Sequence, residues 1–318
     1  MSVPELVNIV SRASRLSRPF RVTEGRNFRL HDVHPGSTGD LKSKRDADGW
    51  LERDIARLSQ LQEKLYAESR WGLLLIFQAM DAAGKDGTIK HVMSGVNPQG
   101  CQVYSFKTPS REELDHDFLW RTSRCLPERG RIGIFNRSYY EETLIVRVHP
   151  ELLDNQRLPS TVVTKHVWQE RFTDIVAFER YATRNGIAIC KFFLHVSRDE
   201  QERRFKRRLE LPSKNWKFSS ADAREGEHWP KYMRAYEDMI RHTSSPHAPW
   251  YVVPADNKWF TRLVVSAAIV DAMEELNLAF PKMDRAQRKE LAAARAALDD
   301  AERQNSHHKR KNRRGNHL

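Results

Sequence analysis

The segment at residues 77–88 constrains the fold more than any other part of the chain, because it joins an apolar run to a predicted helix through small residues. The run at 73–77 has the composition of a buried strand, and Lys85 follows Gly84 where the helix should begin. Backbone N–H groups at a helix start attract anions, and a lysine there can follow a phosphoryl group. The sequence therefore predicts a phosphate-binding turn.

The turn departs from the P-loop pattern G-x-x-x-x-G-K-[ST] at two positions. Ala79 stands in the place of the first glycine, and Asp86 in the place of the hydroxyl that binds Mg²⁺. An ordinary strand-to-helix turn with an exposed lysine is the alternative, but a strand before the turn and acids beside it favour phosphate binding. The candidate phosphate ligands are Ala82, Ala83, Gly84, Lys85, Asp86, Gly87 and Thr88.

Asp81 lies inside the turn, four residues before Lys85. A carboxylate repels a phosphate unless a cation lies between them, and Mg²⁺ is held by one or two carboxylates together with phosphate oxygens. We therefore predict Mg²⁺ as the cofactor and Asp81 as its ligand or as a group that acts on the acceptor. The alternative is that Asp81 or Asp86 caps the helix, and we favour capping for Asp86.

A second candidate site follows the apolar run at 132–135. Asn136 stands where P-loop enzymes commonly end a neighbouring strand with an acid, and it can orient a hydroxyl but brings no charge. Arg137 can bind phosphate oxygens through both arms of its guanidinium. In the alternative interpretation, Asn136 is a turn residue and Arg137 is exposed.

A third candidate is the basic helix predicted over residues 199–211, with the loop that follows it. Arg204 and Arg208 are four residues apart and share one face of that helix. A solvated helix face is the usual alternative. The excess of cations equally fits a polyanion surface or a lid that closes over phosphates and excludes water. The cations are Arg203, Arg204, Lys206, Arg207, Arg208, Lys214 and Lys217.

Apolar runs alternate with helical patterns along most of the chain. The predicted strands are residues 73–79, 102–106, 132–135, 187–196 and 250–254, and the predicted helices are 51–66, 87–94, 112–123, 142–148, 162–183, 199–211, 229–243, 260–276 and 284–302. This alternation predicts an α/β fold with a parallel five-stranded sheet covered by helices. Ligands of such sheets bind beyond the carboxyl ends of the strands.

The net charge of +12 suggests a polyanionic partner. Residues 303–318 hold six Lys and Arg residues and no acid, so this tail could bind any polyanion. We expect a solvated N-terminal arm (1–50), a phosphotransferase domain (51–280) with a lid at about 199–244, and a C-terminal helix and basic tail (281–318). No run reaches the roughly 20 apolar residues of a membrane helix, so we expect no membrane partner. The three cysteines form no C-x-x-C pair, which fits a reducing cytoplasm.

Six segments, in this order, resemble motifs of the polyphosphate kinase 2 family. They are residues 80–87, 95–100, 133–140, 201–205, 212–219 and 248–256, and together they span most of 51–276. The resemblance implies a P-loop kinase-like fold with a helical lid. It also implies Mg²⁺-dependent transfer of a terminal phosphoryl group between inorganic polyphosphate and a nucleotide. Asn97, Lys214 and Lys217 lie in the matching segments and are further candidates for phosphate or nucleotide binding.

Position by position, the resemblance implies that Lys85 and its turn hold phosphates, that Asp81 binds Mg²⁺ or helps to activate the acceptor, and that Arg137 contacts the transferring group. Arg204, Arg208 and Lys217 would come from the lid. Many family members have aspartate where this chain has Asn136. Asparagine there resembles the branch that phosphorylates both nucleoside mono- and diphosphates.

The expected activity is therefore phosphoryl transfer from polyphosphate to AMP or ADP, with the reverse reaction also possible. One alternative is an ATP-dependent small-molecule kinase, which needs the same turn but no excess of lid cations. Another is a basic protein that binds nucleic acid without catalysis. We expect nucleic acid to bind at most weakly, through the tail, and we expect the enzyme to be a homo-oligomer.

Overall fold

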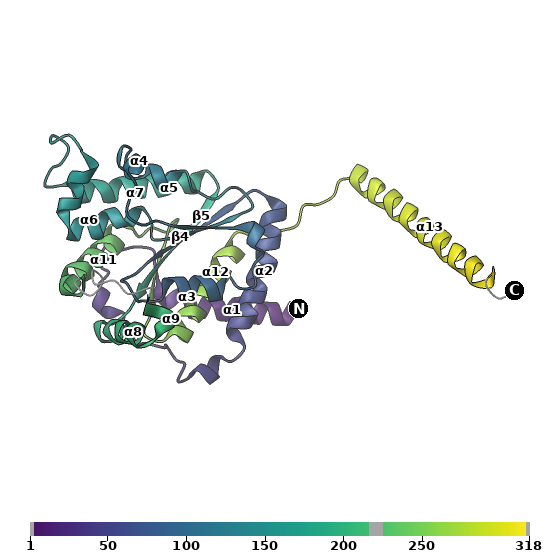
Figure 1. The fold of residues 1–318 in the computed structure, drawn as a ribbon, viewed down its shortest axis with the longest axis horizontal. Coiled ribbons are helices and arrows are strands. Elements are labelled where there is room, and N and C mark those ends of the chain that lie inside the picture. Colours follow the sequence, from purple (N-terminus) through teal and green to yellow (C-terminus); the bar gives the residue numbers. More distant parts are fainter. Residues whose placement is uncertain (1–2, 216–224, 316–318) are drawn as a thin grey trace. The chain divides into compact units, whose positions relative to one another are not determined.

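A six-stranded sheet lies at the centre of the computed structural model, which describes residues 3–215 and 225–315 (Figure 1). The strands run in the order β1-β6-β5-β2-β4-β3. Their bounds are β1 Arg21–Val22, β2 Gly72–Gln78, β3 Cys101–Ser105, β4 Ile132–Asn136, β5 Ile187–His195 and β6 Trp250–Pro254. Strands β2 to β6 are parallel, and β1 pairs with β6 antiparallel. The five predicted strands are confirmed, and β1 is an additional sixth strand.

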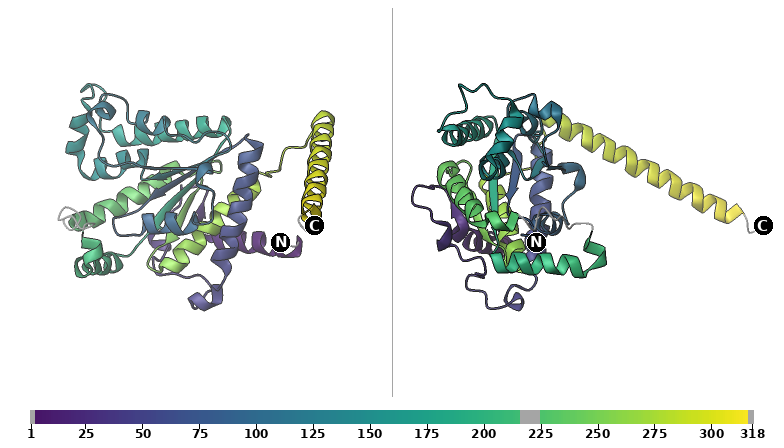
Figure 2. Two further views of the ribbon diagram at one scale, coloured as in Figure 1. Left: turned by 45° about the vertical axis from the view of Figure 1, so that its right-hand side comes forward. Right: turned by 60° about the vertical axis from the view of Figure 1, so that its left-hand side comes forward.

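Helices cover both faces of the sheet, and further views show the same layers (Figure 1; Figure 2). One layer holds α1 (Val3–Ser17), α2 (Trp50–Glu68), α3 (Lys85–Val92) and α12 (Lys258–Glu275). The other holds α6 (Ile145–Val148), α7 (Val167–Arg184) and α11 (Trp229–Thr243). Because both faces are covered, β2 is buried along its whole length. Its Phe77 ring stacks on Phe192 of β5 at 4.9 Å.

The N-terminal segment is not a solvated arm, so that expectation was wrong. Helix α1 packs on α12, where Ile9 is 3% exposed and Ala13 is fully buried. Arg12 forms an ion pair with the buried Asp54 of α2, and the Asp54 carboxylate also accepts a hydrogen bond from Ser266 of α12 at 3.0 Å. The apolar spacing of α1 buries one face, and that face anchors the N-terminus on the core.

Two predicted helices differ from the structure. The pattern at 112–123 is interrupted and gives two short helices, α4 (Arg111–Leu114) and α5 (Trp120–Ser123). Asp117 lies between them and accepts a hydrogen bond from the Leu119 N–H at 2.9 Å, which is a local turn that competes with helix. The pattern at 142–148 becomes α6 preceded by the 3-10 helix η5 (Tyr139–Thr143). The helix predicted at 229–243 is present with the same bounds, and the remaining predicted helices are present with shifted ends.

A buried ionic cluster fixes the segment that follows β4. Lys191 of β5 donates hydrogen bonds to the Glu179 carboxylate of α7 at 2.6 Å and to the Thr243 carbonyl at 2.7 Å. Tyr139 and Tyr140 of η5 both donate to Glu179, at 2.9 and 2.7 Å. Because these charged groups have their partners, the cluster can stay buried. It holds η5 in place directly beside the end of β4.

The chain divides into two units, Met1–Ala279 and Phe280–Leu318. The first contains the whole sheet and its covering helices. The second contains α13 (Arg285–Gly315), which is longer than the helix predicted at 284–302. None of the described helices is long and apolar enough to cross a membrane.

Candidate active site

The predicted turn lies at the carboxyl end of β2, as expected for a parallel sheet. Gly84 has φ 107°, a conformation that glycine adopts far more readily than other residues, and it forms the N-cap of α3. Ala82 also has a positive φ, 62°. The chain therefore bends sharply, and the first N–H groups of α3 have no acceptor within the helix. Such a geometry suits an anion.

Lys85 lies beneath this bend and is 8% exposed. Its ammonium donates a hydrogen bond to the Ala79 carbonyl at 2.7 Å. Burial lowers the pKa of Lys85, while the nearby carboxylate of Asp81 acts in the opposite direction. The lysine is thus held at the turn and is not an exposed side chain, which removes the alternative interpretation of an ordinary turn with a free lysine.

Asp81 and Arg137 form an ion pair across the ends of two neighbouring strands. Arg137 Nη2 lies 2.7 Å from Asp81 Oδ1, and Arg137 Nη1 lies 3.9 Å from the Glu141 carboxylate. Although burial alone would favour the neutral acid, the charges of Lys85 and Arg137 lower the pKa of Asp81. Burial raises the pKa of Glu141 despite the charge of Arg137. Glu141 is a site residue that the sequence analysis missed.

Asn136 is the last residue of β4, and its amide donates a hydrogen bond to the Asp86 carboxylate at 2.8 Å. Asp86 does not cap α3, contrary to expectation, because Gly84 is the N-cap and no side chain caps it. The β2–β4 register explains the pairing: Phe77 lies opposite Asn136, so the turn after Phe77 meets the end of β4.

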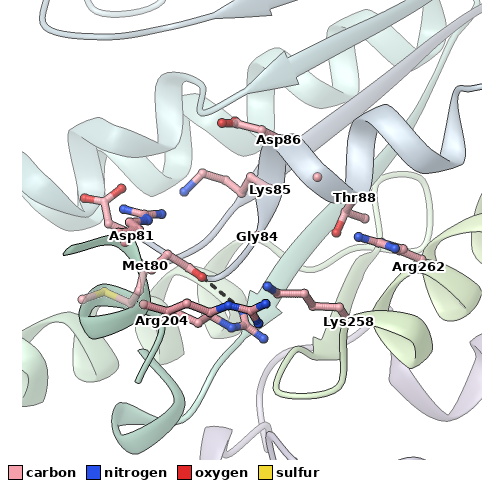
Figure 3. Close-up of a pocket in the computed structure, with 13 residues that line it drawn as sticks. Met80, Asp81, Gly84, Lys85, Asp86, Thr88, Arg204, Lys258 and Arg262 are labelled. Carbon is pink, nitrogen blue, oxygen red and sulfur yellow. Dashed lines mark hydrogen bonds between the residues drawn. The ribbon is translucent and has the colours of Figure 1, made fainter. Parts of the chain in front are cut away.

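A cavity of about 470 Å³ opens between the turn, α3, α12 and α8 (Arg198–Glu210). Figure 3 shows the lining side chains, with Lys258 and Arg262 of α12 opposite the turn. Basic side chains outnumber acidic ones here, so the cavity favours a polyanion. Its lining residues are Met80, Asp81, Ala82, Gly84, Lys85, Asp86, Gly87, Thr88, Arg204, Arg207, Arg208, Lys258 and Arg262.

Lys258 and Arg262 were missed by the sequence analysis. They are four residues apart and share a face of α12. That helix was interpreted only through its apolar face, which does pack on the core. The available signal was a pair of cations at helical spacing directly after the strand at 250–254, since a segment after a parallel strand lies at the ligand-binding edge of the sheet.

Arg204 is held by the protein through all of its guanidinium nitrogens. Its Nε donates to Glu200 at 2.6 Å. Nη1 donates to the carbonyls of Ala82 and Ala83, and Nη2 to those of Ala255 and Asp256, at 2.6 to 3.0 Å. Arginine has five N–H donors, and these contacts engage all of them. This geometry makes Arg204 a positioning residue that joins the turn to the end of β6, whereas the sequence analysis predicted a contact with phosphate.

Of three other predicted ligands, one lies outside this arrangement, and the structure does not describe the side chains of the other two. Asn97 caps the short helix η4 (Pro98–Gly100), where its side chain accepts a hydrogen bond from the Gln99 N–H at 3.0 Å, and it does not line the cavity. Lys217 lies outside the described residues, and so does the side chain of Lys214. Arg208 does line the cavity, together with Arg207.

A second cavity, of about 250 Å³, is bordered by Arg137, which does not line the first one. Arg137 and Glu141 line it, together with apolar residues such as Phe106 and Ile145 and a further cation, Arg121. Asp81 and Lys85 line only the first cavity. The Asp81–Arg137 pair therefore stands between a strongly basic cavity and a partly apolar one.

Residues 41–281 match the family described as Polyphosphate kinase 2. The chain is 52% identical over 283 residues to the ADP-polyphosphate phosphotransferase of Rhodopseudomonas palustris, covering 89% of this chain and 98% of that protein. It is 41% identical over 276 residues to the AMP/ADP-polyphosphate phosphotransferase of Meiothermus ruber, covering 86% and 98%. The crystal structure of polyphosphate kinase 2 from Arthrobacter aurescens matches with a TM-score of 0.79 at 40% identity, covering 88% of this chain and 96% of that one.

Proposed function

Because the chain belongs to the polyphosphate kinase 2 family, we propose that it transfers a terminal phosphoryl group from inorganic polyphosphate to a nucleoside mono- or diphosphate. The names of its relatives support both acceptors, since one is an ADP- and another an AMP/ADP-polyphosphate phosphotransferase. The observation that carries the proposal is the Asp81–Arg137 pair between two cavities of different character. Phosphoryl transfer requires the donor and the acceptor to bind on opposite sides of the charged groups that contact the transferring phosphoryl group.

In this proposal the basic cavity holds the donor chain and the partly apolar cavity holds the nucleotide. A polyphosphate chain presents only anionic oxygens, which match the cations of α8 and α12. A nucleotide presents a base as well as phosphates. It therefore matches a cavity that combines Phe106 and Ile145 with Arg121 and Arg137. The reacting phosphates would then meet at Arg137, which lines the acceptor cavity and pairs with Asp81 of the donor cavity.

A divalent metal ion, Mg²⁺ by proposal, fits this centre. The Asp81 side chain is 35% exposed at the mouth of the donor cavity, so it can contribute an oxygen ligand. Among the side chains that the structure describes, no group of three or more His, Cys, Asp or Glu could hold a metal by itself. Phosphate oxygens would therefore complete the coordination, as is usual for Mg²⁺ at phosphoryl-transfer sites. When bound, the ion would neutralise charge on the phosphate oxygens.

The protein's own contribution is positioning and charge. The turn N–H groups and Lys85 would hold the phosphate at the end of the donor chain, and Arg137 would approach the transferring group. Asn136 cannot act as a base, because its amide takes no proton at neutral pH. A phosphate acceptor needs no base, since most of its oxygens are already ionised at pH 7. The neutral residue at this position therefore favours a nucleotide acceptor over the hydroxyl acceptor of a small-molecule kinase.

The direct test mixes purified protein, Mg²⁺ and polyphosphate with AMP or ADP, and it measures the phosphorylated nucleotide by chromatography. We expect transfer to at least one of them, and GMP and GDP assayed in parallel would show which base the enzyme prefers.

Removal of residues 303–318 should leave the transfer rate unchanged while weakening any binding to nucleic acid. Transfer only from ATP to a small molecule, or no transfer at all, would contradict the proposal.

Replacing Arg262 by alanine should raise the KM for polyphosphate about tenfold and leave the KM for ADP unchanged. The reason is that Arg262 lines only the donor cavity and can supply a charge-assisted hydrogen bond to a phosphate away from the reacting one. Steady-state kinetics with each substrate varied in turn measures both constants. Arg184→Ala, at an exposed cation of α7, is the matched control. A change in the KM for ADP would contradict this prediction and would indicate that α12 contacts the nucleotide acceptor.

A further inference from the structure

A third cavity, of about 390 Å³, lies between the N-terminal segment, the end of β5 and α11. It shares no lining residue with the donor or acceptor cavity. Leu30, Pro35 and Met233 supply apolar walls, Trp229 supplies an aromatic ring, and His195 lies at the carboxyl end of β5. Its volume falls within the range of small-molecule sites, roughly 300–1,000 Å³. The proposed phosphotransfer gives it no role.

His195 is 7% exposed, and its Nδ1 has no hydrogen-bond partner among the described residues. Buried polar atoms without a partner are rare in native proteins, so each one needs an explanation. Burial lowers the pKa of His195 to about 4, and the ring is therefore neutral at pH 7. A neutral imidazole offers one donor and one acceptor. The Nδ1 atom is itself buried, so a ligand in the cavity meets the exposed part of this neutral ring, on which a planar base can stack.

The rim of the cavity carries a cation available to a ligand. Arg234 is exposed on α11 and forms no ion pair or hydrogen bond among the described residues. It lies five residues after Trp229 and next to Met233, so the same helix supplies the aromatic wall and the charge. A guanidinium at this position can bind a phosphate through two parallel hydrogen bonds.

These features together select one class of ligand. A bare polyphosphate chain has no apolar surface and would leave the walls of Trp229 and Met233 uncovered. A purely apolar molecule would leave the charge of Arg234 without a partner. A planar base with a phosphate group satisfies all of them, because bases stack on aromatic rings and phosphates bind arginine. We propose that this cavity is a second nucleotide site that binds a nucleoside monophosphate, with its base between Trp229 and His195 and its phosphate at Arg234.

Hydrogen bonds also connect the wall of this cavity to the candidate active site. Ser197, which lines the cavity, donates its N–H to the Asp256 carboxylate at 2.8 Å. The Asp256 carbonyl accepts a hydrogen bond from Arg204 at 3.0 Å, and the Asp256 N–H donates to the Pro35 carbonyl at 3.1 Å. A nucleotide in this cavity, which Pro35 and Ser197 line, is therefore connected to the phosphate-binding turn through three successive hydrogen bonds, the last from Arg204 to the carbonyls of Ala82 and Ala83. Occupancy of the site should change the rate of phosphotransfer through Arg204.

The test uses a photoreactive azido derivative of AMP as the probe, on the full chain without polyphosphate. We expect covalent labelling at Trp229, mapped by peptide mass spectrometry, and loss of most of that label in Met233→Trp, which fills the cavity. Labelling in the acceptor cavity should persist in this variant and shows that it is folded. No label at Trp229, or a label there that Met233→Trp leaves unchanged, would overturn the proposal.

A second variant removes only the rim charge. Arg234→Glu should weaken AMP binding at this site about tenfold and leave adenosine binding unchanged, because only AMP carries the phosphate. Lys231→Glu, on the same helix and outside the cavity, is the control of equal charge change. Equal effects of the two variants would contradict a phosphate contact at Arg234. Phosphotransfer is measured in parallel, so that absence of activity and absence of this site are separate results.

Discussion

Replacing Lys85 by alanine should lower kcat for phosphotransfer about a thousandfold or more, because a single positive group at a phosphoryl-transfer site stabilises the transition state by that much. Lys85 is the buried cation at the bend of the turn, with its ammonium 2.7 Å from the Ala79 carbonyl. No other lysine of α3 can reach that position, since Lys90 lies exposed at the other end of the helix. Steady-state kinetics with polyphosphate and ADP measures the loss.

The fold should survive this change, because burial already disfavours the charged form of Lys85 and lowers its pKa. Lys90→Ala is the matched control, and it should keep normal turnover. Circular dichroism and the melting temperature check that both variants are folded. Near-normal transfer by a folded Lys85→Ala variant would defeat the assignment of this turn as the phosphate site.

Asp81→Asn is expected to have the second-largest effect, a loss of roughly a hundredfold to a thousandfold in kcat together with a need for more Mg²⁺. The substitution keeps the shape of the side chain and removes its charge. The charges of Lys85 and Arg137 lower the pKa of Asp81, so the native carboxylate stays ionised at neutral pH and available to a cation. A Mg²⁺ titration of the rate, at fixed polyphosphate and ADP, measures the shift.

Two roles for Asp81 give different results in this experiment. If Asp81 serves only the structure, through its ion pair with Arg137, the variant should melt at a lower temperature and keep the native Mg²⁺ dependence. If Asp81 holds the metal, the Mg²⁺ dependence itself should change. Asp174→Asn, at an exposed aspartate of α7, controls for the loss of one negative charge.

Much of the fold could be predicted because the strands of a covered parallel sheet are apolar throughout. The runs at 73–79 and 187–196 have that character, and both are central strands of the sheet. The turn after β2 was predicted for the same reason, since it combines a strand end with Gly84 and Lys85. Strand β1 was missed because it has only two residues, Arg21 and Val22, which cannot form a recognisable pattern. The family predicted from six ordered motifs is confirmed.

The site was harder to predict, because its composition depends on which segments meet in space. Lys258 and Arg262 follow the turn by more than 170 residues and join it only through the order of the strands. The contact of Asn136 with Asp86 depends on the β2–β4 register, and no spacing rule gives that. Helical spacing placed Arg204 and Arg208 on one face, but it could not indicate that backbone carbonyls engage the first of them.

The hydrogen bonds of Arg204 also determine how the basic helix α8 can move. Its guanidinium joins carbonyls of residues 82–83 to carbonyls of residues 255–256, and Glu200, one turn earlier, holds its Nε. The first two turns of α8 are therefore held against the phosphate-binding turn and the end of β6. If α8 closes over the donor proposed above, it would pivot beyond Arg204 and carry Arg207 and Arg208 toward the donor, while Arg204 stays in place. Polyphosphate could then bind without breaking the hydrogen bonds of Arg204. The phosphate-binding turn would keep its conformation from one catalytic cycle to the next.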